Sequence, residues 1–312
     1  MFIKIFQQLS YKDVNIAGGK GASLGEMTRA KMPVPPGFVI LAAAFDRFLE
    51  ETDLSAEIAA VLKKVNYQDI NSVDKASNII RDLIYDQVIP ADLKKEILAE
   101  FKKLKAKFVA VRSSATAEDS AVASWAGELE TYLDTTEKWL IENVKKCWSS
   151  LYTPRAIFYR QEKKLLKTKV SVAVVVQKMI ESEVSGIAFT VHPVTKDKNQ
   201  LIIEAGLGLG EAIVSGQITP DAYVIDKRDF SIMDINIAKQ EMMIIRKAPS
   251  GVKQVKVSKA KQEKQKLNGR QIIELVKICL SIEKHYKKPQ DIEWALANGK
   301  FYITQSRPIT TL

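Results

Sequence analysis

The 312-residue sequence is poor in cysteine and histidine, with two of each. Cys147 and Cys279 lie far apart in helix-like segments, so the sequence predicts neither a disulfide framework nor a zinc site. His192 follows a strand-like run, and His285 lies at the end of a Lys-flanked helical pattern. We interpret both histidines as structural or surface residues.

Long apolar runs are also missing. A membrane-spanning helix needs roughly 20 consecutive apolar residues, and no run approaches that length. Met1 to Ile5 leads directly into polar residues, without the apolar segment and cleavage site of a signal peptide. Hydrophobic residues make up 46% and charged residues 27%, as in ordinary globular proteins. We therefore expect a cytoplasmic protein that does not enter a membrane.

An excess of acidic residues is absent as well, because the formal net charge is +10. The lysines are spread over predicted helices and lack interleaved aromatic residues, so we predict no nucleic-acid partner. We interpret most of the densest basic stretch, Lys239 to Arg270, as a solvated connecting segment. An anionic nucleotide substrate requires less positive charge than a nucleic acid does.

The end of the chain is typical of a β-hairpin. Runs rich in β-branched and aromatic residues flank Asn298-Gly299, a strong turn signal, and Pro308 closes the second strand. A two-residue turn would put Glu293 and Gln305 on opposite faces. A three-residue loop with Gly299 in the left-handed conformation puts them on one face, and we choose this loop.

This register gives the hairpin two chemically different faces. The polar face carries Asp291, Glu293, Gln305 and Arg307, and the apolar face carries Ile292, Trp294, Leu296 and Tyr302. Carboxylate and amide oxygens suit Mg²⁺, and a guanidinium offers a bidentate fork to phosphate. The alternative is a solvated polar face with one Glu–Arg ion pair.

A glycine-rich segment near the N-terminus is a candidate for phosphate binding. Gly18-Gly19-Lys20-Gly21 precedes a predicted helix, where backbone N–H groups and the Lys20 ammonium could form a phosphate cradle. The spacing is not that of a Walker A loop, because Lys20 is followed by glycine and the serine comes three residues later.

A second candidate follows a buried-strand pattern. Phe108 to Val111 delivers Arg112 beside two serines, which suits phosphate, and an ion pair of Arg112 with Glu118 or Asp119 is the alternative. The next segment has small residues around Gly127 and could cover a ligand.

Apolar periodicity predicts the remaining elements. We expect several helices over 42–105, one from Asp134 with a bend or restart at Pro154, and one from Asn268 to about His285. Strands are expected at 108–111, 170–180, 185–190, 201–205 and 223–226. Gln177 to Glu181 has the character of a hinge, where exposed main-chain groups could pair with an adenine edge. The glycines at 206–210 lack dinucleotide-fingerprint spacing, so we reject a Rossmann fold.

Five motifs occur in order along the chain. They are 18–24 (GGKGASL), 111–115 (VRSSA), 126–132 (AGELETY), 189–193 (FTVHP), and 291–294 (DIEW) with 305–308 (QSRP). Together they resemble the N-terminal ATP-binding domain of the phosphoenolpyruvate synthase and pyruvate phosphate dikinase family, which includes the rifampicin phosphotransferases. The resemblance spans nearly the whole chain.

The resemblance implies an α+β fold of the ATP-grasp type, in which two lobes, expected at 1–180 and 181–312, close on Mg-ATP. It implies that Lys20 and Arg112 contact the ATP phosphates and that Arg307 clamps a phosphate, and these three would be the catalytic residues. The other implied nucleotide ligands are Gly127, Thr131, Gln177, Met179, Glu293 and Gln305. The implied Mg²⁺ ligands are Glu293, Gln305 and, as a further candidate, Asp291.

The resemblance also implies in-line phosphoryl transfer to a histidine on a separate swivelling domain. His192 and His285 lack the Thr-Ser-His-Ala-like motif of that acceptor, so we expect a kinase or phosphotransferase whose acceptor domain is supplied in trans or encoded downstream. Three hypotheses stay open: a phosphoenolpyruvate synthase-like half-enzyme, the same domain serving an antibiotic-type acceptor, and a non-catalytic ATP-sensing module.

Overall fold

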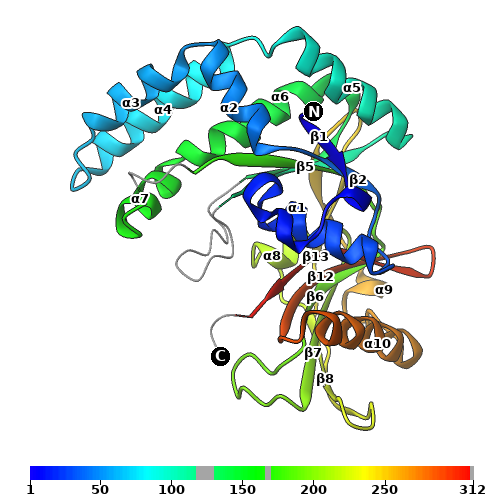
Figure 1. Ribbon diagram of the computed structural model, residues 1–312. Coiled ribbons are helices and arrows are strands. Elements are labelled where there is room, and N and C mark those ends of the chain that lie inside the picture. The colour runs from blue at the N-terminus through cyan, green and yellow to red at the C-terminus, as the bar shows by residue number, and fades with distance from the viewer. Residues whose placement is uncertain (117–129, 166–169, 310–312) are drawn as a thin grey trace. The chain divides into compact units, whose positions relative to one another are not determined.

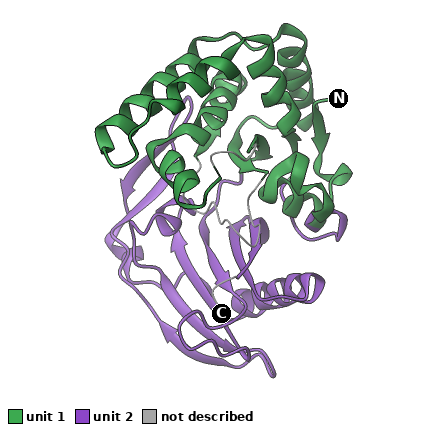
Figure 2. Ribbon diagram, turned by 60° about the vertical axis from the view of Figure 1, so that its left-hand side comes forward, with its two compact units in different colours: residues 1–26, 36–179 green, residues 27–35, 180–312 purple. Residues whose placement is uncertain are grey.

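The computed structural model describes residues 1–116, 130–165 and 170–309. The chain forms two compact units: unit 1 contains residues 1–26 and 36–179, and unit 2 contains residues 27–35 and 180–312. Figure 1 shows the elements in chain order, and Figure 2 distinguishes the two units by colour. The expectation of functional lobes at 1–180 and 181–312 stays a prediction.

Unit 1 is built on a five-stranded antiparallel sheet in the order β1-β2-β5-β3-β4. The strands are β1 (Ile3–Ile5), β2 (Gly37–Ile40), β3 (Val109–Ala115), β4 (Thr131–Thr135) and β5 (Val172–Lys178). Successive side chains of a strand point to opposite faces. Val109, Val111 and Ala115 of β3 therefore enter the hydrophobic core together, while Arg112 and Ser114 lie on the other face.

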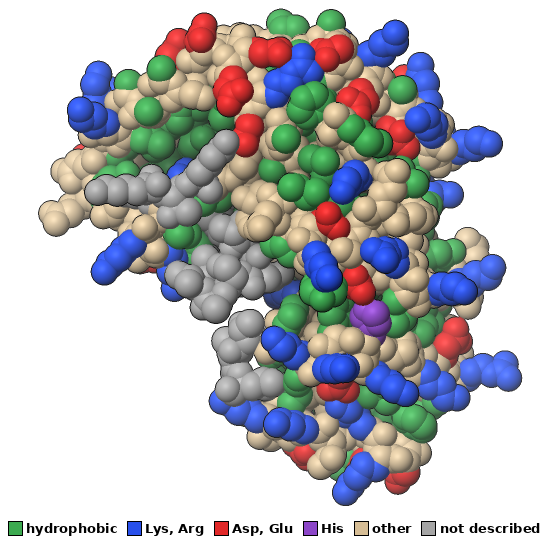
Figure 3. All heavy atoms as spheres, in the orientation of Figure 1, with side chains coloured by type: hydrophobic (Ala, Val, Ile, Leu, Met, Phe, Trp, Pro, Cys, Tyr) green, Lys and Arg blue, Asp and Glu red, His purple; other side chains and the backbone are tan. Residues whose placement is uncertain are grey.

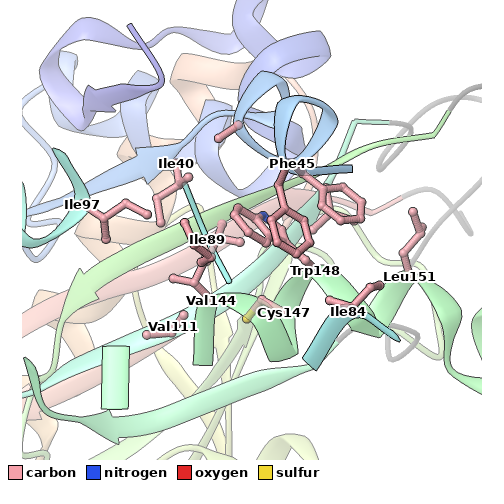
Figure 4. Close-up of a cluster of buried hydrophobic side chains, with 14 of the residues drawn as sticks. Ile40, Phe45, Ile84, Ile89, Ile97, Val111, Val144, Cys147, Trp148 and Leu151 are labelled. Atoms are coloured by element: carbon pink, nitrogen blue, oxygen red, sulfur yellow. The ribbon is translucent and has the colours of Figure 1, made fainter. Parts of the chain in front are cut away.

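Most helices of unit 1 pack on the core face of this sheet. The helices are α2 (Ala42–Glu51), α3 (Leu54–Lys63), α4 (Ile70–Asp86), α5 (Ala91–Leu104), α6 (Glu137–Ser149) and α7 (Pro154–Glu162). Phe45 and Phe48 of α2 stack on Trp148 of α6 at centroid distances of 5.5 and 5.1 Å. Figure 4 shows this cluster together with aliphatic side chains from the strands.

The described residues of unit 1 also contain three short 3₁₀ helices and most of α1, whose last residues belong to unit 2. The 3₁₀ helices are η1 (Phe6–Gln8), η2 (Tyr11–Asp13) and η3 (Ser150–Tyr152). Helix α1 (Val14–Arg29) lies on the opposite side of the sheet from the core, since a Cβ atom at Gly21 would lie 3.1 Å from Val39 Cγ2.

The long helix predicted from Asp134 is divided in two. Strand β4 continues to Thr135 and α6 begins at Glu137, so the predicted capping by Asp134, which has φ +54°, is wrong. The predicted restart at Pro154 is confirmed, with Thr153 as the N-cap of α7. Proline fits the first helical position because its fixed φ is helical and its missing N–H is not needed there.

Unit 2 contains a six-stranded antiparallel sheet in the order β13-β12-β6-β7-β8-β9. The strands are β6 (Val184–Phe189), β7 (Gln200–Leu207), β8 (Asp221–Asp226), β9 (Ile232–Asn236), β12 (Gln290–Ala297) and β13 (Lys300–Pro308). The short helix α8 (Glu211–Val214) follows β7. Helix α10 (Gly269–Tyr286) buries an apolar stripe and contacts β12. Its capping box, formed by Asn268 and Gln271, confirms the predicted start.

The basic stretch that we interpreted as a solvated connecting segment contains some regular structure. It contains the hairpin β10 (Met242–Arg246) and β11 (Val252–Lys256), and the short helix α9 (Lys259–Gln262). The Lys266 ammonium is buried and donates a 2.9 Å hydrogen bond to the buried carboxylate of Asp221. The interpretation therefore holds for the exposure of most of these side chains, but it missed the hairpin, the short helix and the burial of Lys266, because a single lysine gives no signal in the sequence that its charge is paired.

The mixture of helices and antiparallel sheets agrees with the α+β part of the fold prediction. Lys and Arg side chains occur over the whole face drawn in Figure 3. Among the helices in the described ranges, none combines the length and the apolar character that crossing a membrane requires.

Candidate functional site

The glycine-rich segment of α1 packs against the end of β3. Gly18 has φ +69° and ψ 171°, which interrupts the helix. A Cβ atom at Gly18 would lie 2.2 Å from Ser114 Oγ, so only glycine fits there. The Gly21 N–H donates a 3.3 Å hydrogen bond to the same Oγ atom. The two motifs that carry Lys20 and Arg112, nearly a hundred residues apart, are thus adjacent within unit 1.

Strand pairing adds two more predicted site residues to this arrangement. Arg112 lies opposite Thr131 of β4 and opposite Val175 of β5. Directly opposed residues of antiparallel strands share a face. Gln177, two residues beyond Val175, lies on that face as well. We call the set Lys20, Arg112, Ser114, Thr131 and Gln177 the unit 1 face.

Residues of the unit 1 face differ in exposure. Arg112 is 8% exposed, Thr131 is exposed, and Lys20 is half-buried. A guanidinium held in such a dry position interacts strongly with an anion that reaches it, because water screens the charge less. Gly127, the remaining predicted residue of this region, lies outside the described residues.

The predicted adenine hinge follows β5. The N–H groups of Lys178 and Met179 donate to Pro36 and Phe108 carbonyl oxygens at 2.8 and 3.0 Å, so these donors are already used within unit 1. Gln177 is 3% exposed, and its Nε2 atom has no hydrogen-bond partner in the described part of the chain. A buried amide donor of this kind costs free energy until an acceptor arrives. An adenine nitrogen would be such an acceptor.

The C-terminal hairpin has the predicted strands but not the predicted loop. Ala297 pairs with Lys300, so the turn contains two residues, Asn298 and Gly299, with φ values of 50° and 70°. The three-residue loop was therefore wrong. Glu293 and Gln305 are nevertheless opposed, because the pairing shifts at a β-bulge that leaves Thr304 as the extra residue.

Because of the bulge, Tyr302 does not lie on the predicted face of the hairpin. Tyr302 lies opposite Ala295, on the face of Glu293, and not with Trp294 as predicted. Ile303 opposes Trp294 instead, and Phe301 makes an edge contact with the indole at 5.6 Å. The prediction failed because it carried one unbroken alternation along the second strand.

The polar residues of the hairpin form one face of unit 2. Asp291 lies opposite Arg307, and Arg307 Nε and Nη2 donate to Asp291 Oδ2 at 2.8 and 2.7 Å. The expected alternative of an ion pair on this face is thus present, with Asp291 in place of a glutamate. Burial raises the pKa of Asp291, the Arg307 charge opposes this shift, and the Glu293 charge adds to it.

One acidic residue on this face was not predicted. Glu204 of β7 lies opposite Ile187 of β6, which lies opposite Glu293 of β12, so a single row across the sheet carries both carboxylates. Burial raises the pKa of Glu204, and the Asp291 charge raises it further. A glutamate inside an otherwise apolar strand was the available signal. We call Glu204, Asp291, Glu293, Gln305 and Arg307 the unit 2 face.

One of the three predicted magnesium ligands already has a partner within the chain. Glu293 and Gln305 present hard oxygen atoms from opposed positions, which fits Mg²⁺. Asp291 is already held by Arg307. No group of three or more His, Cys, Asp or Glu side chains in the described ranges is arranged to hold a metal by itself. Magnesium binding therefore stays a prediction that centres on Glu293 and Gln305.

A comparison with known protein families identifies the family of the chain. The model of the pyruvate phosphate dikinase AMP/ATP-binding domain matches residues 14–312, so the chain belongs to this family of nucleotide-binding domains.

Among curated relatives, a probable phosphoenolpyruvate synthase of Methanocaldococcus jannaschii is 46% identical across the whole chain and 27% of its own length. The phosphoenolpyruvate synthase of Pyrococcus furiosus is 43% identical across the whole chain and 44% of its own length. The rifampicin phosphotransferase of Bacillus subtilis is 37% identical over 98% of the chain and 35% of its own length. The chain thus spans less than half of each of these relatives.

Proposed function

We propose that the chain is the ATP-binding part of a phosphoenolpyruvate synthase-like dikinase and transfers phosphate from Mg-ATP to a histidine on a separate domain or chain. The observation that supports the proposal is the packing of the Gly18–Gly21 segment, which carries Lys20, against Ser114 of β3, the strand in which Arg112 lies opposite Thr131 and on the same face as Gln177. Membership of an AMP/ATP-binding family supports the choice of nucleotide.

In this proposal the two units act as the lobes of an ATP-grasp fold and close on the nucleotide. Lys20 and Arg112 bind the phosphates from unit 1, and Arg307 clamps a phosphate from unit 2. Thr131 and Gly127 cover the phosphates, while Gln177 and Met179 hold the adenine. Fixed positive charge neutralises the charge of the transferring group, which is where phosphoryl-transfer enzymes gain most of their rate.

Glu293 and Gln305 would hold the magnesium ion, with Asp291 as a further ligand. Bound Mg²⁺ would neutralise phosphate charge and orient the phosphate oxygens. Arg307 has two tasks here, because its guanidinium both binds a phosphate and, through two hydrogen bonds, favours the charged form of Asp291.

The two histidines of the chain are not proposed as acceptors. His192 Nδ1 accepts hydrogen bonds from the N–H groups of Val194 and Thr195, both at 3.2 Å, and so stabilises the turn after β6. His285 lies at the end of α10 and makes an edge contact with Tyr286. The acceptor is therefore proposed in another domain, encoded downstream or supplied in trans, in a cytoplasmic protein.

Two measurements test the proposal. A ligand at 100 times its dissociation constant adds about 2.7 kcal/mol to the stability of a folded state that alone binds it, so Mg-ATP should raise the melting temperature. Next, the chain is mixed with ATP labelled on the β-phosphate and a separately expressed phosphohistidine domain. Acid-labile label on that domain is the expected result, while label on this chain would contradict the assignment of its histidines.

The names of the relatives suggest two kinds of molecule as the final phosphate acceptor. Two of those compared are named phosphoenolpyruvate synthases, and one is named a rifampicin phosphotransferase. Pyruvate is therefore the proposed acceptor, and an antibiotic is the alternative. ATP binding without any label on the histidine domain, at high micromolar protein, would favour a non-catalytic ATP-sensing module instead.

A further inference from the structure

Ser114 lies at the junction between the segments that carry Lys20 and Arg112. Its side chain is fully buried, and it shares a face of β3 with Arg112. Its Oγ atom accepts the 3.3 Å hydrogen bond from the Gly21 N–H. The Gly18 backbone is so close that an added Cβ would lie 2.4 Å from the Ser114 carbonyl oxygen. Strand β3 and helix α1 thus meet at Ser114.

The hydrogen bond satisfies a need of the helix backbone. Helical dihedral angles are interrupted at Gly18, so a new helical run begins after it. The first N–H groups of a helical run have no acceptor in a preceding turn, and Gly21 lies within that first turn. Serine oxygens commonly cap such groups from the residue before the helix. Here the cap comes from Ser114, 93 residues later.

We infer that Ser114 is a positioning residue for Lys20: by capping the helical run that carries Lys20, it fixes the ammonium group relative to the Arg112 guanidinium. The inference rests on the proposed function, in which both charges contact the ATP phosphates. The neighbouring Ser113 has a different task, since its Oγ points to the core face and donates to the Glu130 carbonyl oxygen at 2.6 Å.

Ser114→Ala removes the acceptor atom and adds no atom that could clash. Mg-ATP affinity, measured by calorimetry on the full chain, should fall about five-fold, as expected for loss of a helix cap. Adenosine affinity should not change, because adenosine lacks the phosphates that Lys20 binds. Ser77→Ala is the matched control, since Ser77 is equally buried in α4 and its Oγ has no hydrogen-bond partner in the described chain.

The decisive comparison is a double-mutant cycle with Lys20→Met. If Ser114 acts through Lys20, Ser114→Ala weakens Mg-ATP binding in the wild-type background and has no further effect in the Lys20→Met background. Losses that simply add, or an equal loss of adenosine affinity, would overturn the inference alone. A wild-type chain that binds no Mg-ATP would overturn the proposed function and the inference with it.

A second variant protects the test against misfolding. If Ser114→Ala fails to fold, Ser114→Cys keeps the shape of the side chain with a weaker acceptor, and the same cycle is run with it. Coupling to Lys20 supports the inference in either variant, and additivity in the cycle overturns it.

Discussion

Arg307 lies directly opposite Asp291 across β12 and β13, and two of its guanidinium nitrogens donate to a single carboxylate oxygen of that residue. The carboxylate is mostly buried, with 14% of its side chain exposed, whereas the Arg307 side chain is 37% exposed. The pair therefore joins a partly exposed cation to a mostly buried carboxylate, and the cation favours the charged form of that carboxylate.

Arg307→Ala should make the stability of the chain more dependent on pH. The variant removes the Arg307 charge, which opposes the effect of burial on Asp291, so the pKa of Asp291 should rise further above its ordinary value of 3.8. When the pKa of a carboxylic acid is higher in the folded state than in the unfolded state, the free energy of unfolding falls as pH rises through the folded-state pKa. We expect a loss of about 1 to 3 kcal/mol at pH 7, most of which disappears near pH 4.

Urea unfolding at several pH values measures this effect. The matched control is Arg307→Ala combined with Asp291→Asn, which has no carboxylate to titrate at this position and should show a flatter pH profile. An equal loss at pH 4 and pH 7 in the single variant would mean that Arg307 contributes packing and not charge.

Glu293→Ala and Trp294→Ala should have opposite effects, because neighbouring residues of β12 point to opposite faces. Glu293 belongs to the unit 2 face, so its loss should weaken use of Mg-ATP and spare the melting temperature. Trp294 is 1% exposed, and its loss should cost about 3 to 5 kcal/mol of stability. Thermal melts and nucleotide titrations on both variants test this. The prediction fails if Glu293→Ala lowers the melting temperature as much as Trp294→Ala does, or if Trp294→Ala impairs nucleotide binding without a loss of stability.

Gly18→Ala should destabilise the chain more than Gly216→Ala does. Both glycines have positive φ, at 69° and 68°, so an added Cβ strains the backbone at each position, and the ψ of 171° at Gly18 adds to the strain there. An added Cβ meets nothing within 4 Å at Gly216 but meets Ser114 at 2.2 Å at Gly18. The melting temperature should therefore fall further for Gly18→Ala than for Gly216→Ala, and equal shifts would show that α1 can move away from Ser114 at little cost.

Lys266→Met should destabilise unit 2 strongly. The variant leaves the Asp221 carboxylate buried without its cation, although Tyr223 still donates to it. Breaking a buried ion pair by removing one partner typically costs about 3 to 5 kcal/mol. The control is Lys264→Met, at an exposed lysine of the same segment, which should change stability by less than about 0.5 kcal/mol. Similar unfolding curves for the two variants would show that the buried pair of Lys266 and Asp221 does not stabilise unit 2.

Much of the fold could be predicted because its signals are local. The apolar runs at 170–180, 201–205 and 223–226 become β5, β7 and β8, and the cap at Asn268 marks the start of α10. The burial of Lys266 could not be predicted, because it depends on Asp221, which lies 45 residues away. Residue type alone favours an exposed position for a lysine.

For the candidate site, the sequence indicated the residue types but not which of them are adjacent. The motifs that carry Arg112 and Lys20 indicated phosphate chemistry, but their adjacency depends on how Gly18 packs against Ser114, which no spacing rule reveals. Glu204 was missed because its place in the row with Glu293 depends on strand order in the sheet. The residue types therefore indicated that the site binds phosphate. Which of these residues lie side by side could be learned only from the pairing of the strands.

The bulge at Thr304 has a consequence for how the hairpin tolerates change. A three-residue loop without a bulge would need the same number of residues and would also place Glu293 opposite Gln305, so the two arrangements differ only between the turn and Thr304. The bulged arrangement buries Phe301 and Ile303 in place of Tyr302. Exchanging the residues at positions 303 and 304 would therefore move the extra residue from the bulge to the turn. The pairing of Glu293 with Gln305, and of Asp291 with Arg307, is therefore the same in both arrangements.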